Sequence, residues 1–168
     1  MIDLYQWFDL YAAYGRTMLA AQMLEQTVVM IVALWRFLRR DKDERTFESI
    51  HNRLLKVPFG KVLQQGIREG SLCGETVEAL ENYRKLRNHL VHSLTPSITL
   101  RLCTKEEPPE VIRELNELAD SFEGARIELT KDVFTLYMLT GGSQQDIIDR
   151  SSELIEKMAK LDRLEKHL

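Results

Sequence analysis

Two residues whose chemistry suits a phosphodiester substrate lie close together in the stretch from Glu81 to His92. Read as a helix, this stretch places Arg87 between Leu90 and Val91, inside an apolar arc. An arginine there is costly to bury unless it is paired, because it does not give up its proton. A guanidinium can hold two phosphate oxygens, and the imidazole of His92 can move a proton near neutral pH. The pair could therefore cleave a phosphodiester bond without a metal ion.

The two residues do not lie on the same side of a regular helix. Five steps of 100° place Arg87 and His92 about 140° apart. His92 instead shares a face with Asn88, and Glu81 is close to that face. One chain alone is therefore not expected to stack the two groups on each other.

The residues around Arg87 are either apolar or basic. The apolar stripe predicted for this helix consists of Ala79, Tyr83, Leu86 and Leu90, widened by Leu80 and Val91. The predicted basic patch consists of Arg84, Lys85, Arg87 and His89. A basic surface with an aromatic residue such as Tyr83 is what single-stranded RNA binding needs, although an ordinary solvated helix face has the same composition.

Other interpretations of these residues remain open. Arg87 could form a salt bridge within or between subunits, and His92 could satisfy the last carbonyl groups of the helix. His89 and His92 are three residues apart and could share a metal ion. Because no carboxylate or cysteine lies at a matching spacing, we predict no metal site and no cofactor.

The elements that must position this stretch are all predicted to be helices. Apolar residues recur every three or four positions, which is typical of helices packed on a core. In the first helix the apolar positions are Leu4, Phe8, Tyr11, Gly15 and Met18, followed by Leu24, Val28, Ile31, Trp35 and Leu38. The predicted helices cover residues 3–39, 46–55, 59–69, 75–93, 108–140 and about 143–166. Residues 97–104 alternate polar and apolar side chains, and we interpret them as a loop.

Composition limits the class of protein. A chain of 168 residues with 44% hydrophobic and 29% charged residues is typical of one soluble domain, here residues 1–168. The longest apolar run, Val28 to Trp35, is far shorter than the roughly 20 residues that cross a bilayer. We therefore expect a cytoplasmic protein without a membrane partner. Because the net charge is −3, any RNA contact must come from a local basic patch.

Arg87-Asn88-His89-Leu90-Val91-His92 resembles the R-polar-x-x-x-H signature of HEPN domains (higher eukaryotes and prokaryotes nucleotide-binding). The segments Ala21-Gln22-Met23-Leu24-Glu25 and Phe59-Gly60-Lys61-Val62-Leu63 also resemble small prokaryotic members. The resemblance covers roughly residues 1–100. It implies an all-α bundle of long up-down helices. It also implies a homodimer in which two signatures face each other across a cleft, and that cleft would bring together groups that one helix separates.

The resemblance also implies an activity. Many members are metal-independent endoribonucleases of toxin–antitoxin, CRISPR-associated and abortive-infection systems. Arg87 and His92 would be the catalytic pair, and Asn88, Arg84, Lys85 and Tyr83 would bind the RNA. The ribose 2′-hydroxyl would attack the adjacent phosphate. One subgroup, whose antitoxin modifies a tyrosine two residues after the histidine, is a poor match because that position is Leu94.

Two other functions fit the same sequence. Some HEPN members have lost cleavage and bind RNA or a nucleotide, or scaffold a partner such as an antitoxin or effector protein. The chain could also be an all-α interaction protein that assembles through the helix predicted after residue 143. There Ile147, Leu154, Leu161 and Leu168 recur every seven residues, a pattern that equally fits packing within one subunit.

Overall fold

The computed structural model describes residues 4–39, 46–94, 108–143 and 145, and the regular structure in these ranges is entirely helical. The elements are α1 (Leu4–Arg39), α2 (Phe47–Leu54), α3 (Phe59–Glu69), α4 (Glu75–His89), the π-helical turn η1 (Leu90–Leu94) and α6 (Pro108–Leu139). The predicted all-α class is confirmed. The predicted loop at 97–104 and nearly all of the helix predicted over 143–166 lie outside the described residues.

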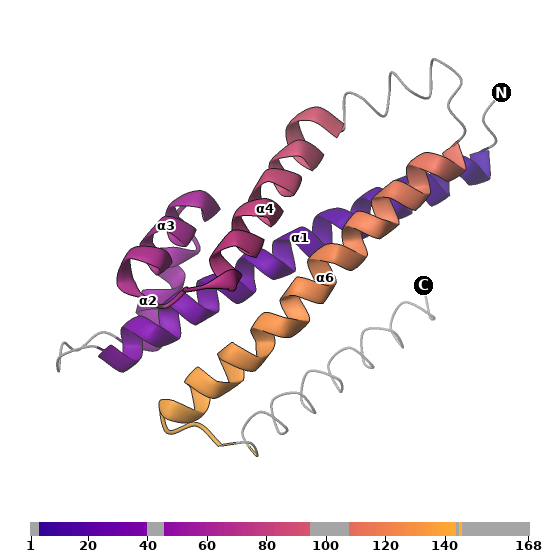
Figure 1. Ribbon diagram of the computed structural model, residues 1–168. Coiled ribbons are helices and arrows are strands. Elements are labelled where there is room, and N and C mark those ends of the chain that lie inside the picture. Colours follow the sequence, from indigo (N-terminus) through magenta and orange to yellow (C-terminus); the bar gives the residue numbers. More distant parts are fainter. Residues whose placement is uncertain (1–3, 40–45, 95–107, 144, 146–168) are drawn as a thin grey trace.

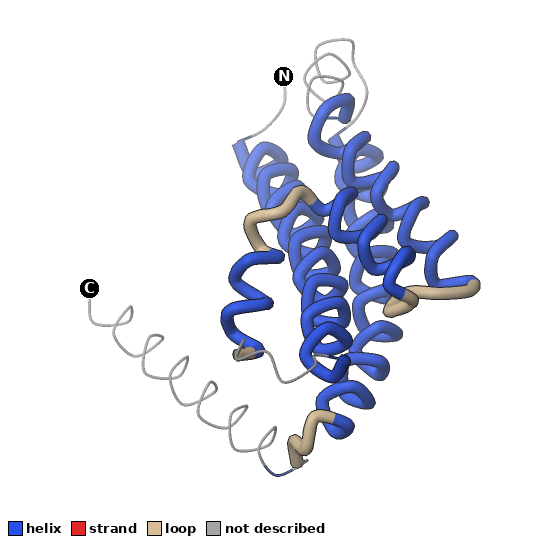
Figure 2. Tube along the Cα trace, turned by 90° about the vertical axis from the view of Figure 1, so that its left-hand side faces the viewer, coloured by secondary structure: helices blue, strands red, loops and turns tan. Residues whose placement is uncertain are grey.

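The two longest helices, α1 and α6, lie side by side and run in the same direction, while α4 runs in the opposite direction (Figure 1). The long helices therefore alternate up, down and up along the chain. The short helices α2 and α3 pack on the C-terminal half of α1, and short loops connect α2, α3 and α4 (Figure 2). This arrangement places the C-terminal end of α4, with the candidate residues, beside the middle of α1.

The core lies between α1 and α6. Val28 of α1 and Leu115 and Phe122 of α6 are at most 1% exposed. Thr17 is also fully buried, and its hydroxyl oxygen lies 2.8 Å from the carbonyl oxygens of Ala13 and Leu115. That hydroxyl links the two helices at a point where apolar packing alone would leave the Leu115 carbonyl without a partner from α1.

The apolar face predicted for the first half of α1 is wrong at three positions. Phe8 and Tyr11 are 64% and 67% exposed, and Gly15 is exposed as well, whereas Met18 packs against the core. The buried positions in this half are Leu10, Ala13, Thr17 and Ala21, and Leu24, Val28 and Ile31 of the second half are buried as predicted. The reason is that α1 has apolar residues on several sides, so its sequence pattern does not distinguish the side that packs on α6. An apolar face is therefore left uncovered by the described residues.

The length and composition of α1 also bear on membrane association. Residues Tyr5–Arg39 are long and apolar enough to span a bilayer, and half of the most apolar window is buried inside the protein. The core helix of a soluble protein passes the same test. Among the described residues, one side of α1 packs in the core, and its other side carries exposed apolar residues.

The stripe predicted for α4 is rotated in the structure. Ala79 and Leu86 are exposed, whereas Leu80 and Leu90 are 1% and 0% exposed. The cause is that α4 also packs on α6, where the ring of Tyr83 lies 5.9 Å from the ring of Phe122. The buried stripe therefore follows positions 80, 83, 87 and 90, and Arg87 lies on the inward-facing side of the helix.

An ion pair fastens α3 to the end of α1. Arg36 donates to both carboxylate oxygens of Glu69 and to the side chain of Gln65. The hydrogen bond from Arg36 is the main cause that lowers the pKa of Glu69 below its ordinary value of 4.5, against a smaller opposing effect of burial. Arg36 thereby stabilises the α3 C-terminus, where Gly70 ends the helix with φ at 75°.

This ion pair should make stability depend on pH. A carboxyl whose pKa is lowered by folding stabilises the protein above its unfolded pKa, and the effect is lost as the pH falls through the folded pKa. We expect Glu69→Gln to lower the unfolding free energy by about 1.5–3 kcal/mol at pH 7. The difference from the unsubstituted protein should shrink below pH 4.5 in urea titrations. Glu128→Gln removes an exposed partner of Lys131 and should change stability little at any pH. A Glu69→Gln effect that persists unchanged into acid would contradict this explanation.

Candidate functional site

Arg87 is held by a carboxylate of its own chain. Its Nε lies 2.8 Å from Oε1 of Glu25 on α1, and the two side chains are 36% and 23% exposed. The N–H does not point at this oxygen, which is shielded from solvent and accepts no hydrogen bond. The contact is therefore an ion pair without hydrogen-bond geometry. Of the pairings that the sequence left open for Arg87, the structure contains the one within a subunit.

The rest of the Arg87 guanidinium is less constrained. Its Nη1 lies 3.4 Å from Oδ1 of Asn88, at the long limit for a hydrogen bond. A guanidinium is planar and presents donors along more than one edge, so a carboxylate at Nε leaves the edge formed by the two Nη atoms for another acceptor. Arg87 is thus fixed on one side by Glu25 and half-exposed on the other, next to the amide of Asn88.

His92 is exposed and lies in the π-helical turn η1. The sequence pattern predicts a regular helix to residue 93, whereas the structure changes helix type after His89. A π-helix forms bonds between residues five apart, and it therefore rotates less per residue than an α-helix. Because Arg87 and His92 are five residues apart, the π turn moves His92 back toward the Arg87 side. Single-turn π segments are frequent at functional sites.

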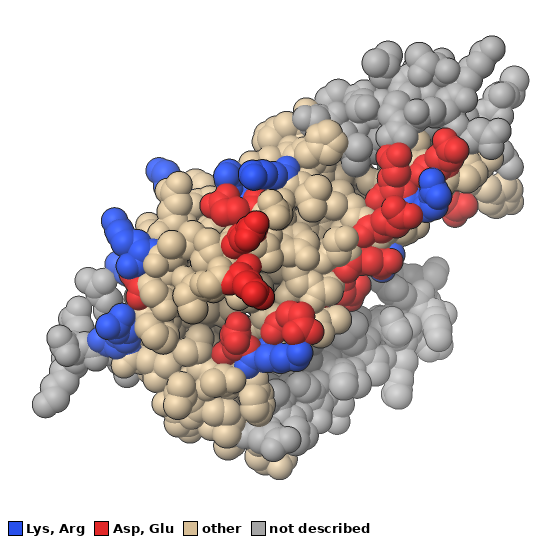
Figure 3. Space-filling view, viewed as in Figure 1, with Lys and Arg blue, Asp and Glu red and all other residues tan. Residues whose placement is uncertain are grey.

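The charged residues of α4 are divided between its two halves. Glu75, Glu78 and Glu81 lie in the first half, and the basic residues and histidines from Arg84 to His92 lie in the second. Acidic side chains also gather along α6 and the first half of α4 on the face seen in Figure 3. Clustered carboxylates of this kind would repel a polyanion from this part of the surface.

The predicted basic patch is only partly available. Lys85, His89 and His92 are all exposed; Lys85 and His89 are four residues apart and share one side of α4, and His92 follows in η1. Arg84 points elsewhere: its Nε donates to Glu81 at 2.7 Å, and its side chain packs over Gly60 of α3. Arg84 therefore joins α3 to α4 in this conformation.

Stacking on a base requires an exposed ring face, and the ring of Tyr83 is not freely exposed. The residue is half-buried and its ring packs against Phe122 in the core. It also lines a cavity of about 380 Å³ between α4 and α6, together with Leu80 and Ala125. One edge of the ring can face this cavity, but the side chain is mainly part of the contact between the two helices.

Glu25 is the site residue that the sequence analysis did not identify. It lies beside a recess of about 250 Å³ between α1 and the loop that joins α2 to α3. Gln22 and Gln26 line the same recess. A possible signal was present, since a carboxylate flanked by core residues Leu24 and Val28 needs a cation, but the sequence does not say which of its arginines supplies it.

The described residues contain no group of three or more histidine, cysteine, aspartate or glutamate side chains that could hold a metal ion. The structure brings Arg87 together with Glu25 and the amide of Asn88, and it leaves His92 exposed in η1, five residues further along the chain. Comparisons with protein-family models, with curated proteins and with solved structures find no match to this chain.

Proposed function

We propose that this chain is a HEPN-type, metal-independent endoribonuclease that acts as a homodimer on single-stranded RNA. One observation carries the proposal: Arg87 faces inward, is fixed through Nε by Glu25, and keeps its Nη edge beside Asn88, five residues before an exposed His92. A structural salt bridge alone would account for Glu25 and Arg87. It would not account for the adjacent amide or for the π turn that carries the histidine.

The reaction follows from what these groups can do. A histidine removes the proton from a ribose 2′-hydroxyl, and the new O2′–P bond forms as the bond from phosphorus to the 5′-oxygen breaks. The leaving 5′-oxygen takes a proton from a second histidine. Arg87 stabilises the negative charge that builds up on the phosphate oxygens, since its guanidinium can hold two of them at once. The products are a 2′,3′-cyclic phosphate and a 5′-hydroxyl.

The second histidine has to come from a second copy of the chain. The uncovered face of α1 supports a dimer: Tyr5, Phe8 and Leu19 are 77%, 64% and 57% exposed, and small residues at Ala12 and Gly15 lie among them. Nothing lies within 4 Å of a Cβ added at Gly15. Small residues allow two helices to approach closely, and a two-fold interface uses the same face twice. We name this set (Tyr5, Phe8, Ala12, Gly15 and Leu19) the α1 face.

The biological setting belongs to the same proposal. HEPN ribonucleases of this size typically serve in toxin–antitoxin or phage-defence systems, so an antitoxin or effector protein is the expected partner. A cytoplasmic location would give the enzyme access to RNA. We expect the exposed side chains of Lys85 and His89 on α4 and of His92 on η1 to contact the RNA backbone.

The direct experiment is cleavage of a labelled single-stranded RNA in the presence of EDTA. We expect products that end in a 2′,3′-cyclic phosphate and a 5′-hydroxyl, and a loss of about 10²–10⁴-fold in rate for His92→Ala, the usual contribution of a proton-transfer group. His89→Ala removes an exposed histidine three residues away that we expect to bind RNA but not to transfer a proton, so it should weaken RNA binding and retain most of the cleavage rate at saturating RNA. Equal activity of His92→Ala and unsubstituted protein would point to a contaminating nuclease.

A second candidate function is a non-catalytic HEPN module that binds RNA or a nucleotide, or scaffolds a partner protein. The observation that favours it is the ion pair itself, because Glu25 offsets the charge of Arg87 and adds a negative charge near the phosphate site. Binding without cleavage in EDTA, with affinity that falls as salt rises, would support this function instead of the enzyme.

A further inference from the structure

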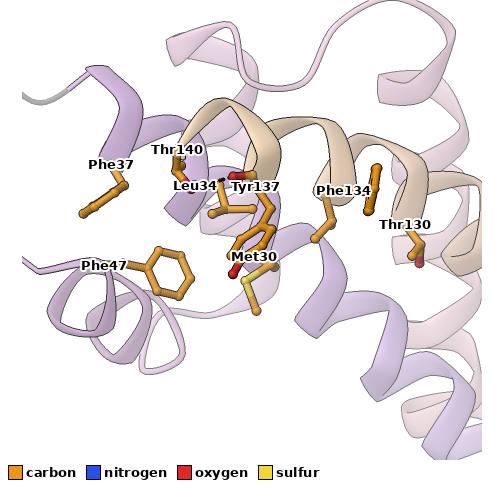
Figure 4. A pocket seen from close by; sticks show the side chains of 9 residues that line it. Met30, Leu34, Phe37, Phe47, Thr130, Phe134, Tyr137 and Thr140 are labelled. Carbon is orange, nitrogen blue, oxygen red and sulfur yellow. Dashed lines mark hydrogen bonds between the residues drawn. The ribbon is translucent and has the colours of Figure 1, made fainter. Parts of the chain in front are cut away.

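Arg87 and the other residues of α4 do not line an apolar recess near one end of the bundle. Its volume is about 440 Å³, and it lies between the C-terminal halves of α1 and α6 and the start of α2. The lining side chains are Met30, Leu34, Phe37, Phe47, Thr130, Val133, Phe134, Tyr137 and Thr140. Figure 4 shows Met30, Phe47 and Tyr137 turned toward a shared space. We name this recess the aromatic groove.

Apolar surface continues from the aromatic groove along α6. Phe134, which lines the groove, is 41% exposed, and Ile127 and Met138 are 52% and 40% exposed. Positions 127, 134 and 138 are seven and four residues apart, so they lie on one side of the helix. Among the described residues this side of α6 lacks a partner that covers it. An apolar stripe of this kind calls for another helix.

The end of α6 directs the chain toward the same place. Gly141 has φ at 89°, and its N–H bonds to the carbonyl of Met138 while the N–H of Gly142 bonds to that of Tyr137. This pair of bonds is a Schellman motif, which reverses the chain at a helix end. A Cβ added at Gly142 would overlap the ring of Tyr137, so the backbone passes directly over a side chain that lines the groove.

We propose that residues 146–168 of the same chain cover the aromatic groove and the adjoining side of α6. These residues follow the turn directly, and their apolar positions Ile147, Leu154 and Leu161 recur every seven residues. A helix over 146–168 would be about 35 Å long, which is enough to pass Ile127. The segment would complete the bundle as a fourth long helix. The proposal does not depend on the ribonuclease function.

Cross-linking in the full-length chain tests this placement. In a protein with Cys73 and Cys103 replaced by serine, Thr130→Cys with Leu154→Cys should be joined by a short bismaleimide within one chain. The expected product is a cross-linked monomer on a denaturing gel. Thr130→Cys with Glu156→Cys is the control, since position 156 lies on the opposite side of the expected helix, and it should cross-link at least about tenfold more slowly.

Three outcomes would overturn the proposal. Cross-linking only between chains means that a second copy fills the groove. Equal cross-linking of both pairs means that the segment has no fixed face. If neither pair reacts, Leu154→Glu decides: the proposal requires a lower unfolding midpoint and faster amide hydrogen exchange around Phe47 and Thr130, and an unchanged midpoint and exchange would overturn it as well.

Discussion

Arg87→Ala is expected to lower the rate of RNA cleavage by about 10²–10³-fold, the loss usually seen when one group that stabilises transition-state charge is removed. Arg87 is the only residue of its motif that offers a planar pair of donors to phosphate oxygens. The measurement is the single-turnover rate on labelled single-stranded RNA in EDTA. If cleavage persists at the unsubstituted rate, Arg87 has no part in the chemistry.

The alanine variant also removes the counterion of Glu25. One oxygen of that carboxylate is shielded from solvent, so its loss of a partner should destabilise the fold as well as the site. Arg87→Lys separates the two effects, because lysine keeps a positive charge for Glu25 but cannot present two parallel donors. We expect Arg87→Lys to unfold near the normal temperature and to cleave at least about tenfold more slowly, since it loses bidentate binding. Normal cleavage by this variant would contradict bidentate phosphate binding.

Phe8→Glu is expected to weaken the dimer by at least about 100-fold, because it places an unpaired carboxylate in an apolar interface. In a two-fold interface the substitution acts twice. Since each site needs both copies, cleavage should be lost in parallel at protein concentrations where the variant is monomeric. Light scattering gives the mass, and the RNA assay gives the activity.

The matched control is Ile67→Glu, which places the same charge at an exposed apolar residue of α3. It should leave both mass and cleavage unchanged. A Phe8→Glu protein that stays dimeric would move the interface away from the α1 face. A monomer that still cleaves RNA would remove the need for a second copy.

Much of the fold could be predicted from local sequence signals. The bounds of α3 were predicted correctly, and those of α2 and α6 to within one residue, because Thr46, Pro58, Gly70 and Gly141 are strong start and stop signals. Thr46 caps α2, because its side-chain oxygen accepts a hydrogen bond from the backbone N–H of Ser49. These features depend on residues close in sequence, which a single chain displays directly.

The side of each long helix that faces the core could not be predicted in the same way. In α1 and α4 apolar residues occupy more than one side, and the buried side is decided by where α6 lies. The pattern therefore favoured Phe8, which is exposed, over Leu10, which is buried, and it placed exposed Leu86 in the same stripe as buried Leu80. Choosing between such sides needs the long-range packing that periodicity does not contain.

The candidate site also combines a feature that the sequence predicts with features that it does not. The need of Arg87 for a partner could be predicted from its apolar surroundings, but Glu25, sixty-two positions earlier, could not be identified as that partner. The π turn at Leu90–Leu94 was equally hidden, since the sequence Leu-Val-His-Ser-Leu contains no residue that forces it. The Glu25 contact depends on how α4 meets α1, and the π turn changes the rotation between Arg87 and His92.

A mixed dimer offers the most direct test of whether two subunits share one ribonuclease site. Unsubstituted and His92→Ala subunits with different affinity tags are combined, and the heterodimer is purified and assayed on single-stranded RNA in EDTA. It holds Arg87 on both chains but an intact His92 on one chain alone. Because the proposed reaction uses a histidine from each copy, we predict a loss of about 10²–10⁴-fold relative to the unsubstituted homodimer. A stable heterodimer that keeps a large part of the homodimer's rate would contradict a site built from both copies.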